Sequence, residues 1–310
     1  MRIARVETPA GARVALVEGD VLRLLAETAD VFDVLRETAV AAPTAEVLPL
    51  DGARLLPPLD PPSIRDFLTF EQHVEGMVRL HQPPREVHPR WYEAPTFYFS
   101  NPHSLVGAND DVAIPPGCEV FDYELEVAAV IGRDGRDLSP SEACDHIVGY
   151  TIFNDWSARD LQFDEMQVGL GPAKGKDSAI TVGPWIVTSD ELAPYRLDGR
   201  LDLALEVRLN GEVVGTDRLG SMAWGFEDLA AYASRGTVVR TGDVLGSGTC
   251  GGGCLAELWG RSGRREPPPL RAGDVVTMHV EGIGTISNRV VAGTEPRSIP
   301  RAASARLEVG

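Results

Sequence analysis

Residues 121–132, FDYELEVAAVIG, indicate the architecture of this chain more directly than any other segment. Glu124 and Glu126 lie two residues apart, and the two-residue period of a β-strand places both side chains on one face. Val127–Ile131 continues as an unbroken apolar run, which indicates that the strand enters a core. Two like charges beside a core are costly unless a cation or hydrogen-bond donors compensate them. A solvated strand end is the plainer interpretation of an isolated Glu-x-Glu pair, so the motif alone leaves both interpretations open.

A second polar cluster follows the strand-like run GYTIF. Residues 154–162, NDWSARDLQ, hold two aspartates, an arginine, an amide and a hydroxyl around one tryptophan. Strand ends and the loops after them are where ligand-binding groups tend to lie. The alternative is the start of a helix, with Asp155 or Ser157 as its N-cap and Arg159 and Asp160 as surface charges.

A third motif, LGPAKGKDS at residues 170–178, places Lys174 and Lys176 among glycines. Glycine lets the backbone and an ammonium group approach an anion closely. An ordinary turn fits the same residues, so this motif too is ambiguous when taken alone.

The rest of the chain predicts many short strands and few helices. Apolar runs of strand length alternate with turns such as Asn-Gly and Gly-Asp, without the regular strand and helix alternation of a doubly wound sheet. Predicted strands are 3–6, 14–17, 21–25, 96–99, 124–131, 147–153, 185–188, 201–209 and 275–280, and predicted helices are 31–35, 64–78, 139–146 and 226–235. We therefore predict a β-rich α+β fold.

A proline-rich segment divides the chain. Residues 55–63, LLPPLDPPS, contain four prolines in nine residues and cannot continue a helix or a central strand. We predict a small N-terminal strand-rich domain over 1–62, with this segment as its linker, a larger second domain over 63–300 and a C-terminal tail over 301–310.

Composition narrows the classes of partner. The 310 residues include 29 Lys and Arg against 46 Asp and Glu, a formal net charge of −17, and no basic run gathers on any segment. We therefore do not expect this protein to bind nucleic acid or an anionic membrane surface. With six histidines beside so many acids, a metal site would be built from carboxylate oxygens and would take a hard cation.

The chain carries no recognisable targeting or membrane-spanning segment. Its N-terminus lacks the apolar centre of a signal peptide, and no later stretch approaches the roughly 18 apolar residues of a membrane span. Four scattered cysteines do not form a disulfide framework, and Cys250 and Cys254 lack the second pair that a zinc site needs. We expect a cytoplasmic protein with spectator thiols.

Six motifs in this order resemble the fumarylacetoacetate hydrolase family. They cover roughly residues 64–295, about three quarters of the chain. The motifs are DFLTFEQH (66–73), DYELEVAAVIG (122–132), GYTIFNDWSARDLQ (149–162), LGPAKGKD (170–177), RTGDVLGSGT (240–249) and EGIGTISN (281–288). The resemblance implies a mixed β-roll catalytic domain that binds a divalent cation, usually within a homodimer.

The resemblance also implies a set of metal ligands. Glu124 and Glu126 match the glutamates on the strand, Asp155 matches the aspartate of NDWSARD, and Asp66 matches a fourth carboxylate of the animal-type hydrolases. Four carboxylate ligands suit Mg²⁺, Mn²⁺ or Ca²⁺ and disfavour zinc.

The catalytic residues implied by the resemblance are His73, Glu257 and Lys176. His73 follows Asp66 by seven residues, as the catalytic histidine does in the animal-type enzyme, whereas a single histidine on a helix is otherwise more often a packing or surface residue. Glu257 resembles the glutamate that orients and activates this histidine, and its alternative is a glutamate at a strand edge. The substrate contacts implied are Arg159, Gln162, Thr249 and, facing the site, Tyr98.

The activity that this resemblance implies is hydrolytic cleavage of a carbon–carbon bond in a β-diketo acid, such as an acylpyruvate. A metal would polarise the carbonyl, His73 held by Glu257 would activate water, and cationic and amide groups would stabilise the oxyanions. Metal-dependent decarboxylation of an oxo acid and isomerisation of a dienoate are alternatives on the same scaffold. A non-catalytic binding protein is a further alternative, which four converging acids disfavour.

Departures from the family pattern bear on the substrate. Leu68 and Met166 replace two tyrosines of the animal enzyme's substrate site, so this pocket is more apolar and fumarylacetoacetate itself fits less well. Phe163, Met166 and Trp91 are equally well explained as packing or as substrate contacts. The proline-bearing segment 81–95 is either a lid over the substrate or a surface loop.

Overall fold

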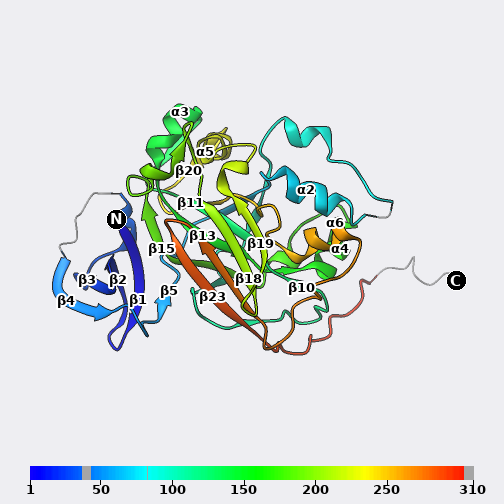
Figure 1. Ribbon diagram of the computed structural model, residues 1–310, viewed down its shortest axis with the longest axis horizontal. Helices are drawn as coiled ribbons and strands as arrows, with labels where there is room; N and C mark the ends of the chain where they lie inside the picture. The colour runs from blue at the N-terminus through cyan, green and yellow to red at the C-terminus, as the bar shows by residue number, and fades with distance from the viewer. Residues whose placement is uncertain (37–42, 82, 304–310) are drawn as a thin grey trace.

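The computed structural model describes residues 1–36, 43–81 and 83–303. A twelve-stranded sheet forms the body of the molecule (Figure 1), in the order β4-β3-β2-β1-β15-β13-β11-β21-β6-β7, with β5 paired to β1 and β8 to β15. Its strands are β1 (Arg2–Thr8), β2 (Gly11–Glu18), β3 (Val21–Leu25), β4 (Pro43–Pro49), β5 (Leu55–Leu56), β6 (Ile64–Phe67), β7 (Phe97–Ser100), β8 (Leu105–Val106), β11 (Leu125–Ile131), β13 (Ile147–Asp155), β15 (Ile180–Thr188) and β21 (Val244–Gly246).

A second sheet of five strands has the order β19-β18-β22-β23-β9. Its strands are β9 (Val112–Ala113), β18 (Ala204–Leu209), β19 (Glu212–Arg218), β22 (Val275–Val280) and β23 (Gly284–Val291). Three two-stranded ladders pair β10 (Phe121–Asp122) with β14 (Ser157–Ala158), β12 (Gly135–Arg136) with β20 (Val238–Val239), and β16 (Arg196–Leu197) with β17 (Arg200–Leu201).

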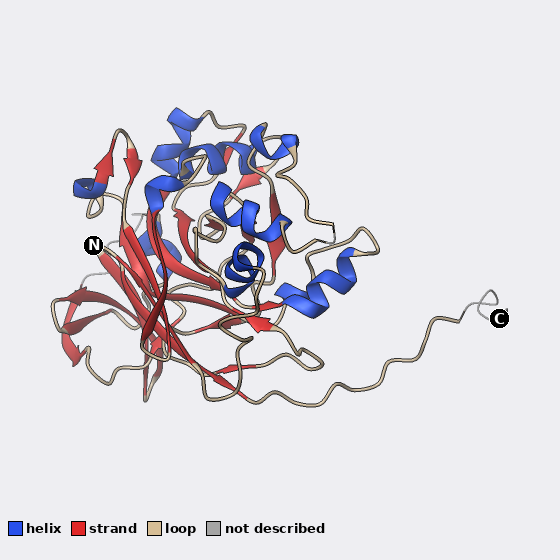
Figure 2. Ribbon diagram, turned by 45° about the vertical axis from the view of Figure 1, so that its right-hand side comes forward, coloured by secondary structure: helices blue, strands red, loops and turns tan. Residues whose placement is uncertain are grey.

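The helices are short and gather on one side of the strands (Figure 2). The α-helices are α1 (Val31–Leu35), α2 (Glu71–Val78), α3 (Pro140–Ala143), α4 (Arg159–Met166), α5 (Phe226–Ser234) and α6 (Leu255–Ser262). The 3₁₀ helices are η1 (Pro89–Tyr92), η2 (Cys144–His146), η3 (Lys174–Lys176), η4 (Ala193–Tyr195) and η5 (Leu219–Ser221). The predicted β-rich α+β class is confirmed.

The apolar run after the glutamate pair forms the centre of the large sheet. Every residue of β11 is buried, and β11 pairs with β13 on one side and with β21 on the other. Its alternate side chains enter two hydrophobic clusters, one containing Val127 and Ala129 and the other Ala128 and Val130. A strand buried on both faces reads as a continuous apolar run, which is the pattern seen in the sequence.

The helix predicted over residues 64–78 is wrong in its first half. Residues 64–67 form the strand β6, which pairs with β21 and β7, and the helix α2 begins only at Glu71. The apolar residues there fit either period, and burial of Ile64 and Phe67 beside neighbouring strands favours the extended form. As part of this strand, Asp66 is buried in the interior.

The N-terminal strands and the strands of the larger second domain share one hydrogen-bonded sheet. β1 pairs antiparallel with β15, through Arg2 with Val187 and Ile3 with Ile186. The division into domains 1–62, 63–300 and 301–310 stays a prediction. The extended C-terminal segment leaves the body of the molecule (Figure 2), and residues 304–310 of the predicted tail lie outside the described residues.

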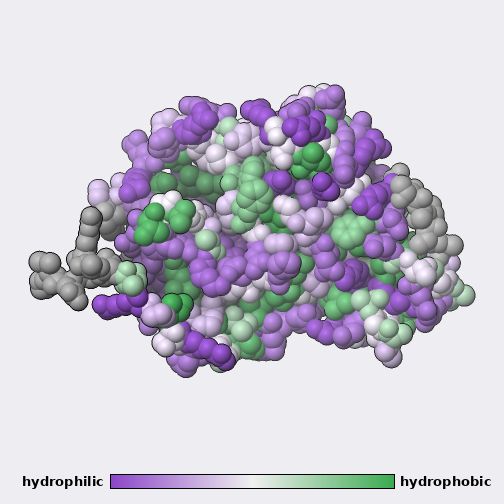
Figure 3. All heavy atoms as spheres, turned by 180° about the vertical axis from the view of Figure 1, so that it is seen from behind, coloured by the Kyte–Doolittle hydropathy of each residue, from purple (hydrophilic) through white to green (hydrophobic). Residues whose placement is uncertain are grey.

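The surface seen from behind is mixed, with hydrophilic residues separating small hydrophobic patches (Figure 3). Among the described residues, no helix combines the length and the apolar character needed to cross a membrane. All four cysteines are free thiols, as predicted, and Cys250 and Cys254 are buried. The expected cytoplasmic location stays a prediction.

Candidate active site

Most of the predicted site residues line a single cavity of about 370 Å³. The helices α2 and α4 contribute to its walls, together with residues of β6, β7 and the segment after β21. The predicted site residues in its lining are Asp66, His73, Tyr98, Glu124, Glu126, Arg159, Gln162, Lys176 and Thr249. The other two, Asp155 and Glu257, lie directly behind lining residues.

Three of the predicted metal ligands converge at the bottom of this cavity. Asp66, Glu124 and Glu126 each offer a carboxylate oxygen, and these oxygens lie within 4.8 Å of one another. The strand register produces this, because Gly246 on β21 lies opposite both Asp66 on β6 and Ala128 on β11.

A glycine on β21 makes room for the carboxylates. A Cβ atom on Gly246 would lie 2.8 Å from Oδ1 of Asp66 and 3.0 Å from Oε2 of Glu126. Any larger residue at this position would push the two acids apart. The RTGDVLGSGT motif therefore has a direct structural link to the acidic cluster, which only the tertiary structure reveals.

Asp155 joins the cluster from the end of β13. Its backbone N–H donates to the carbonyl oxygen of Glu124 at 3.3 Å, which holds the two residues side by side. One of its carboxylate oxygens, Oδ2, accepts a hydrogen bond from Lys176 Nζ at 2.7 Å and another from the hydroxyl of Tyr98. The N-cap alternative for Asp155 is wrong, because the residue is buried and α4 begins at Arg159 without a side-chain cap.

The acidic cluster fits a hard divalent cation. Oδ1 of Asp66, Oε1 of Glu126 and Oδ1 of Asp155 are buried and have no hydrogen-bond partner among the described residues. Buried anionic oxygens without donors are costly, and a cation with oxygen ligands would compensate them. The four acids would hold Mg²⁺, Mn²⁺ or Ca²⁺, as the resemblance implies.

The balance of charge points the same way. Five buried carboxylates, those of the four predicted ligands and of Asp122, face two buried cations, Arg159 and Lys176. A divalent ion would bring this group close to neutrality, which buried charges require.

The pKa values in the cluster reflect this crowding. Burial and the charge of Asp155 raise the pKa of Asp66 to about 8, against the opposing effect of Lys176. Burial and the charges of Asp66 and Glu124 raise the pKa of Glu126 well above its usual value. Burial also opposes ionisation of Glu124, but Arg159 and Lys176 outweigh it and lower its pKa. Glu124 is therefore the fixed anion of the cluster.

Asp122 is a structural member of the site that sequence reasoning missed. Its Oδ2 accepts hydrogen bonds from Nε and Nη2 of Arg159 at 2.9 and 2.8 Å. The same carboxylate accepts from the backbone N–H groups of Leu255 and Ala256, at the start of α6. The signal was present, because Asp122 extends the two-residue alternation of Glu124 and Glu126 by one step.

Arg159 is buried, so its interpretation as a surface charge is wrong. Its Nη2 lies 2.7 Å from Oε1 of Glu124, and its Nη1 donates to Oε1 of Gln162 at 3.2 Å. Asp160, also predicted as a surface charge, accepts a hydrogen bond from the backbone N–H of Glu119. The guanidinium thus connects the metal-ligand cluster to α4.

His73 and Glu257 form a pair behind the cavity wall. Nδ1 of His73 lies 3.5 Å from Oε2 of Glu257, which also accepts from the backbone N–H of Gly252 at 2.7 Å. Nδ1 therefore faces away from the cavity, and Nε2 is the nitrogen left to face it. Burial alone would raise the pKa of Glu257, but His73, the backbone N–H of Gly252 and Arg261 together outweigh burial and keep the pKa below the usual value. The strand-edge alternative for Glu257 is wrong, because Glu257 lies in α6.

Two glycines bring the helices of this pair together. A Cβ atom on Gly76 would lie 2.4 Å from Cγ of Glu257, and one on Gly260 would lie 1.9 Å from the carbonyl oxygen of Gly76. Each glycine lies three residues after the catalytic candidate on its own helix, about one turn away. The close approach of α2 and α6 is what places His73 beside Glu257.

The hydroxyl of Tyr98 and the ammonium group of Lys176 both bond buried carboxylates. The hydroxyl of Tyr98 contacts Oδ2 of Asp66, at 2.7 Å, and Oδ2 of Asp155. These bonds also place Tyr98 where it orients two predicted metal ligands, and its predicted contact with the substrate stays a prediction. The ammonium group of Lys176 bonds the carboxylates of Glu124 and Asp155. The neighbouring Gly175 lies close against Gln162, because a Cβ atom on Gly175 would lie 2.5 Å from Cβ of Gln162.

Trp91 is a packing residue of the segment 81–95. It is buried, its indole N–H donates to the carbonyl oxygen of Leu68 at 2.8 Å, and its ring packs edge-on against Trp224. Whether the segment closes over the substrate stays a prediction.

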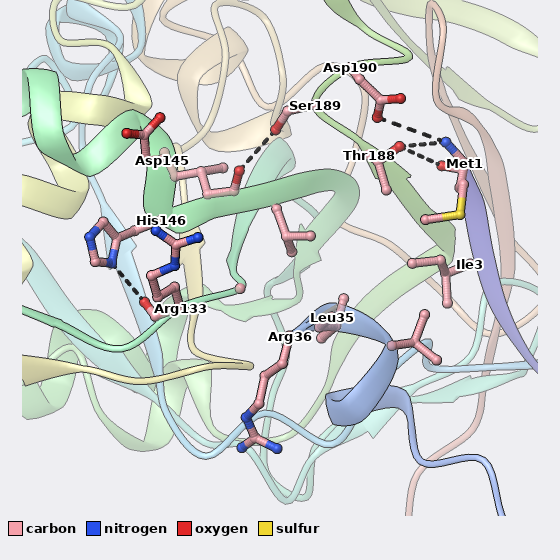
Figure 4. Close-up of a pocket in the computed structure, with 14 residues that line it drawn as sticks. Met1, Ile3, Leu35, Arg36, Arg133, Asp145, His146, Thr188, Ser189 and Asp190 are labelled. Atoms are coloured by element: carbon pink, nitrogen blue, oxygen red, sulfur yellow. Dashed lines mark hydrogen bonds and ion pairs between the residues drawn. The ribbon is translucent and has the colours of Figure 1, made fainter. Parts of the chain in front are cut away.

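A second cavity, of about 450 Å³, lies away from these residues, between the N-terminal strands and the start of β13 (Figure 4). Two of its polar groups are paired, since the amino group of Met1 bonds Thr188 and Nδ1 of His146 contacts the carbonyl oxygen of Arg133. The described residues of its lining include no buried acidic cluster like that of the first cavity, which is therefore the candidate active site.

A buried carboxylate cluster and a buried histidine–glutamate pair thus meet at one cavity, as expected of an enzyme of the family that the six motifs resemble. Comparison with known proteins supports that family. The family described as fumarylacetoacetate (FAA) hydrolase C-terminal matches residues 63–291, and one described as Rv2993c-like, N-terminal matches residues 1–58. The chain belongs to the fumarylacetoacetate hydrolase family.

Its relatives carry different activities in their names. A fumarylacetoacetate hydrolase from Exiguobacterium antarcticum shares 28% identity at a TM-score of 0.76, with 94% of this chain and 100% of that chain covered. A 5-carboxymethyl-2-hydroxymuconate delta-isomerase from Mycobacterium smegmatis shares 29% identity at a TM-score of 0.72, with the same coverage. An oxaloacetate tautomerase of Xenopus laevis mitochondria is 35% identical over 188 residues, 61% of this chain and 55% of that protein.

Proposed function

We propose that this protein is a divalent-metal-dependent hydrolase that cleaves a carbon–carbon bond in a β-diketo acid such as an acylpyruvate. The observation that carries the proposal is the buried pair of His73 and Glu257, with Nδ1 and Oε2 3.5 Å apart, against the cavity that holds the acidic cluster. Hydrolysis needs an activated water, and such a pair supplies a general base for it, whereas decarboxylation of an oxo acid needs no activated water.

The proposed metal site consists of Asp66, Glu124, Glu126 and Asp155. A bound Mg²⁺, or Mn²⁺ or Ca²⁺, supplies Lewis-acid polarisation of the substrate's oxygens. A site whose protein ligands are all oxygen atoms favours these ions over zinc.

The residues of the chain then divide the proton transfers between them. The carboxylate of Glu257 lies 3.5 Å from Nδ1 of His73 and favours the proton on that nitrogen. Nε2 is then free to take a proton from water as the water oxygen attacks the acyl carbonyl carbon. The bond between that carbon and the neighbouring methylene carbon breaks, and its electron pair stays on the methylene carbon. His73 returns its proton to this carbon, which gives a carboxylate and pyruvate from an acylpyruvate.

Polar groups around the reacting carbonyl would stabilise the oxyanion. Arg159, Gln162 and Lys176 line the cavity together, and Arg159 and Lys176 are held in place by buried carboxylates. Prepositioned donors cost no reorganisation when charge develops, which is the main source of such stabilisation. Thr249 lines the same cavity and is suited to a hydrogen bond with the substrate.

Isomerisation or tautomerisation of a related acid is the second candidate. The names of the Mycobacterium smegmatis isomerase and the Xenopus laevis tautomerase favour it. Such a reaction moves a proton between carbon and oxygen, which His73 can do without a water molecule. The homodimer implied by the family stays a prediction.

The test is turnover of an acylpyruvate panel, with oxaloacetate beside it, in Mg²⁺ and in EDTA. We expect metal-dependent release of pyruvate and a carboxylic acid, with kcat falling by about 10²–10⁴ in His73→Ala. His279→Ala is the matched control, because His279 is exposed on β22 and lies outside the cavity lining. Tautomerisation or carbon dioxide release from oxaloacetate, without cleavage of any acylpyruvate, would refute the hydrolase and support the alternatives.

A further inference from the structure

Helices α2 and α4 each line the candidate active site with one face, and the two faces have a similar sequence of side-chain types. The α4 residues in the lining are Arg159, Gln162, Phe163 and Met166, which follow the spacing of one helical face. On α2 the lining begins at His73. It continues with Val74, Met77 and Val78, and then His81 just beyond the helix.

Polarity changes along both faces in the same direction. The first residues of each face, His73 on α2 and Arg159 and Gln162 on α4, are polar and buried. The later residues within each helix are apolar and less buried, since Met77 and Val78 on α2 are half-buried and Phe163 and Met166 on α4 are 37% and 44% exposed. The cavity is therefore charged at its floor and apolar towards its mouth, where Leu68, Phe97 and Pro172 complete the wall.

Among the described residues that line the mouth there is no lysine or arginine to pair with a second carboxylate, and Arg85, whose charge acts on His81, is not part of the lining. The two cationic lining residues, Arg159 and Lys176, are buried at the floor and already bond Asp122, Glu124 and Asp155. His81 is the remaining ionisable group of the outer wall. Burial, with a smaller contribution from Arg85, lowers its pKa below the usual value of a histidine, which favours the neutral ring.

We propose that this site takes diketo acids whose acyl tail is apolar and uncharged, an alkyl or aryl chain rather than a chain that ends in a carboxylate. The dioxo-acid end of the substrate would meet the floor, and the tail would lie between Met77 and Val78 of α2 and Phe163 and Met166 of α4. This inference rests on the proposed function and names its substrate class. Fumarylacetoacetate and oxaloacetate both carry a second carboxylate, so neither belongs to this class of substrates with an uncharged tail.

The physical reason is desolvation. A methylene group that leaves water for an apolar wall improves binding by about fourfold, the equivalent of about 0.8 kcal/mol. A tail carboxylate in the same place would lose its hydration without gaining a partner. The outer wall should therefore select against charge as well as for apolar area.

The experiment compares acylpyruvates with tails of equal length that end in a methyl group or in a carboxylate. We expect kcat/KM to rise by about fourfold for each added methylene until the cavity is filled, and the carboxylate tail to be at least tenfold worse. Equal or better turnover of the carboxylate tail would overturn the inference while leaving the proposed hydrolysis intact.

A charge placed in the mouth tests the same inference in the protein. Met166→Arg should reduce kcat/KM for the apolar tail and raise it for the carboxylate tail, because the new guanidinium pairs with that group. Val168→Arg is the matched control, since Val168 is 75% exposed and is not part of the cavity lining. The same change in preference in both variants would mean a general effect of net charge and would refute the assignment of the mouth.

A failure of the proposed function remains distinguishable from a failure of this inference. If no acylpyruvate is cleaved, the same compounds are titrated calorimetrically into the Mg²⁺-loaded protein as unreacted ligands. Tighter binding of the methyl-ended tail would then support the apolar mouth alone. Tighter binding of the carboxylate-ended tail, or equal binding of both, would overturn it.

Discussion

Replacing Gly76 by alanine should separate the two helices that hold the catalytic pair. The added Cβ would lie 2.4 Å from Cγ of Glu257, 3.1 Å from its carbonyl oxygen and 3.2 Å from its Cα. Ordinary contacts begin near 3.4 Å, so α2 must move from α6 by about 1.0 Å. The 3.5 Å distance between Nδ1 of His73 and Oε2 of Glu257 would then rise to about 4.5 Å, beyond hydrogen-bond reach.

The expected losses differ for activity and for stability. A misplacement of about 1 Å can reduce turnover by about 10²-fold, and we expect that reduction in kcat with little change in KM. Overpacking costs about 1–3 kcal/mol in the free energy of unfolding, offset by up to about 1 kcal/mol from the better helix propensity of alanine. For a chain of this size the net loss lowers Tm by up to about 4 °C.

Gly132→Ala is the matched control for this prediction. Its Cβ would lie 2.6 Å from Cβ of Val148, a comparable clash between residues that are not part of the lining of the candidate active site. We expect it to lower Tm by a similar amount while kcat stays close to that of the wild type. Both variants are measured by steady-state kinetics and by thermal unfolding. If Gly76→Ala loses stability but keeps its kcat, the close approach of α2 and α6 does not hold the catalytic pair.

Three further changes test the metal cluster and its supports. Tyr98→Phe removes the hydroxyl that bonds Asp66 and Asp155, so Mg²⁺ affinity by calorimetry should fall by about 10–100-fold, and unchanged affinity would contradict this role. In the folded protein without metal, the pKa of Asp66 is raised to about 8. Between about pH 4 and pH 8 the folded protein therefore keeps a proton that the unfolded chain has released. The free energy of unfolding of the metal-free protein falls as pH rises through this range. In EDTA, Tm should therefore fall between pH 5 and pH 8 more steeply for the wild type than for Asp66→Asn, and parallel curves would refute the shift. Gly175→Ala should raise KM by displacing Lys176 from its carboxylates, and an unaltered KM would exclude a substrate role for that segment.

Local sequence determined the strands and the chemical character of the site. The run Val127–Ile131 fixed a buried central strand, because an apolar residue at every position leaves no face for water. The alternation of Glu124 and Glu126 fixed two acids on one face. The resemblance of six motifs predicted which acids and which histidine share one site, and the structure brings them together.

Tertiary contacts determined what local patterns left ambiguous. The residues 64–67 fit a helix or a strand, and only pairing with β21 and β7 made them a strand that carries Asp66 inwards. Arg159 has the same local sequence whether exposed or buried, and only the position of Asp122, 37 residues earlier, makes it a buried partner. Such choices depend on groups that are distant along the chain.

The spacing of the catalytic pair shows the same limit most clearly. The sequence by itself supplied a histidine, a glutamate and a glycine three residues after each of them. It could not indicate that Gly76 and Gly260 face each other, because their contact joins segments about 180 residues apart. Packing determined that distance, since two helices approach this closely only where neither has a side chain between them.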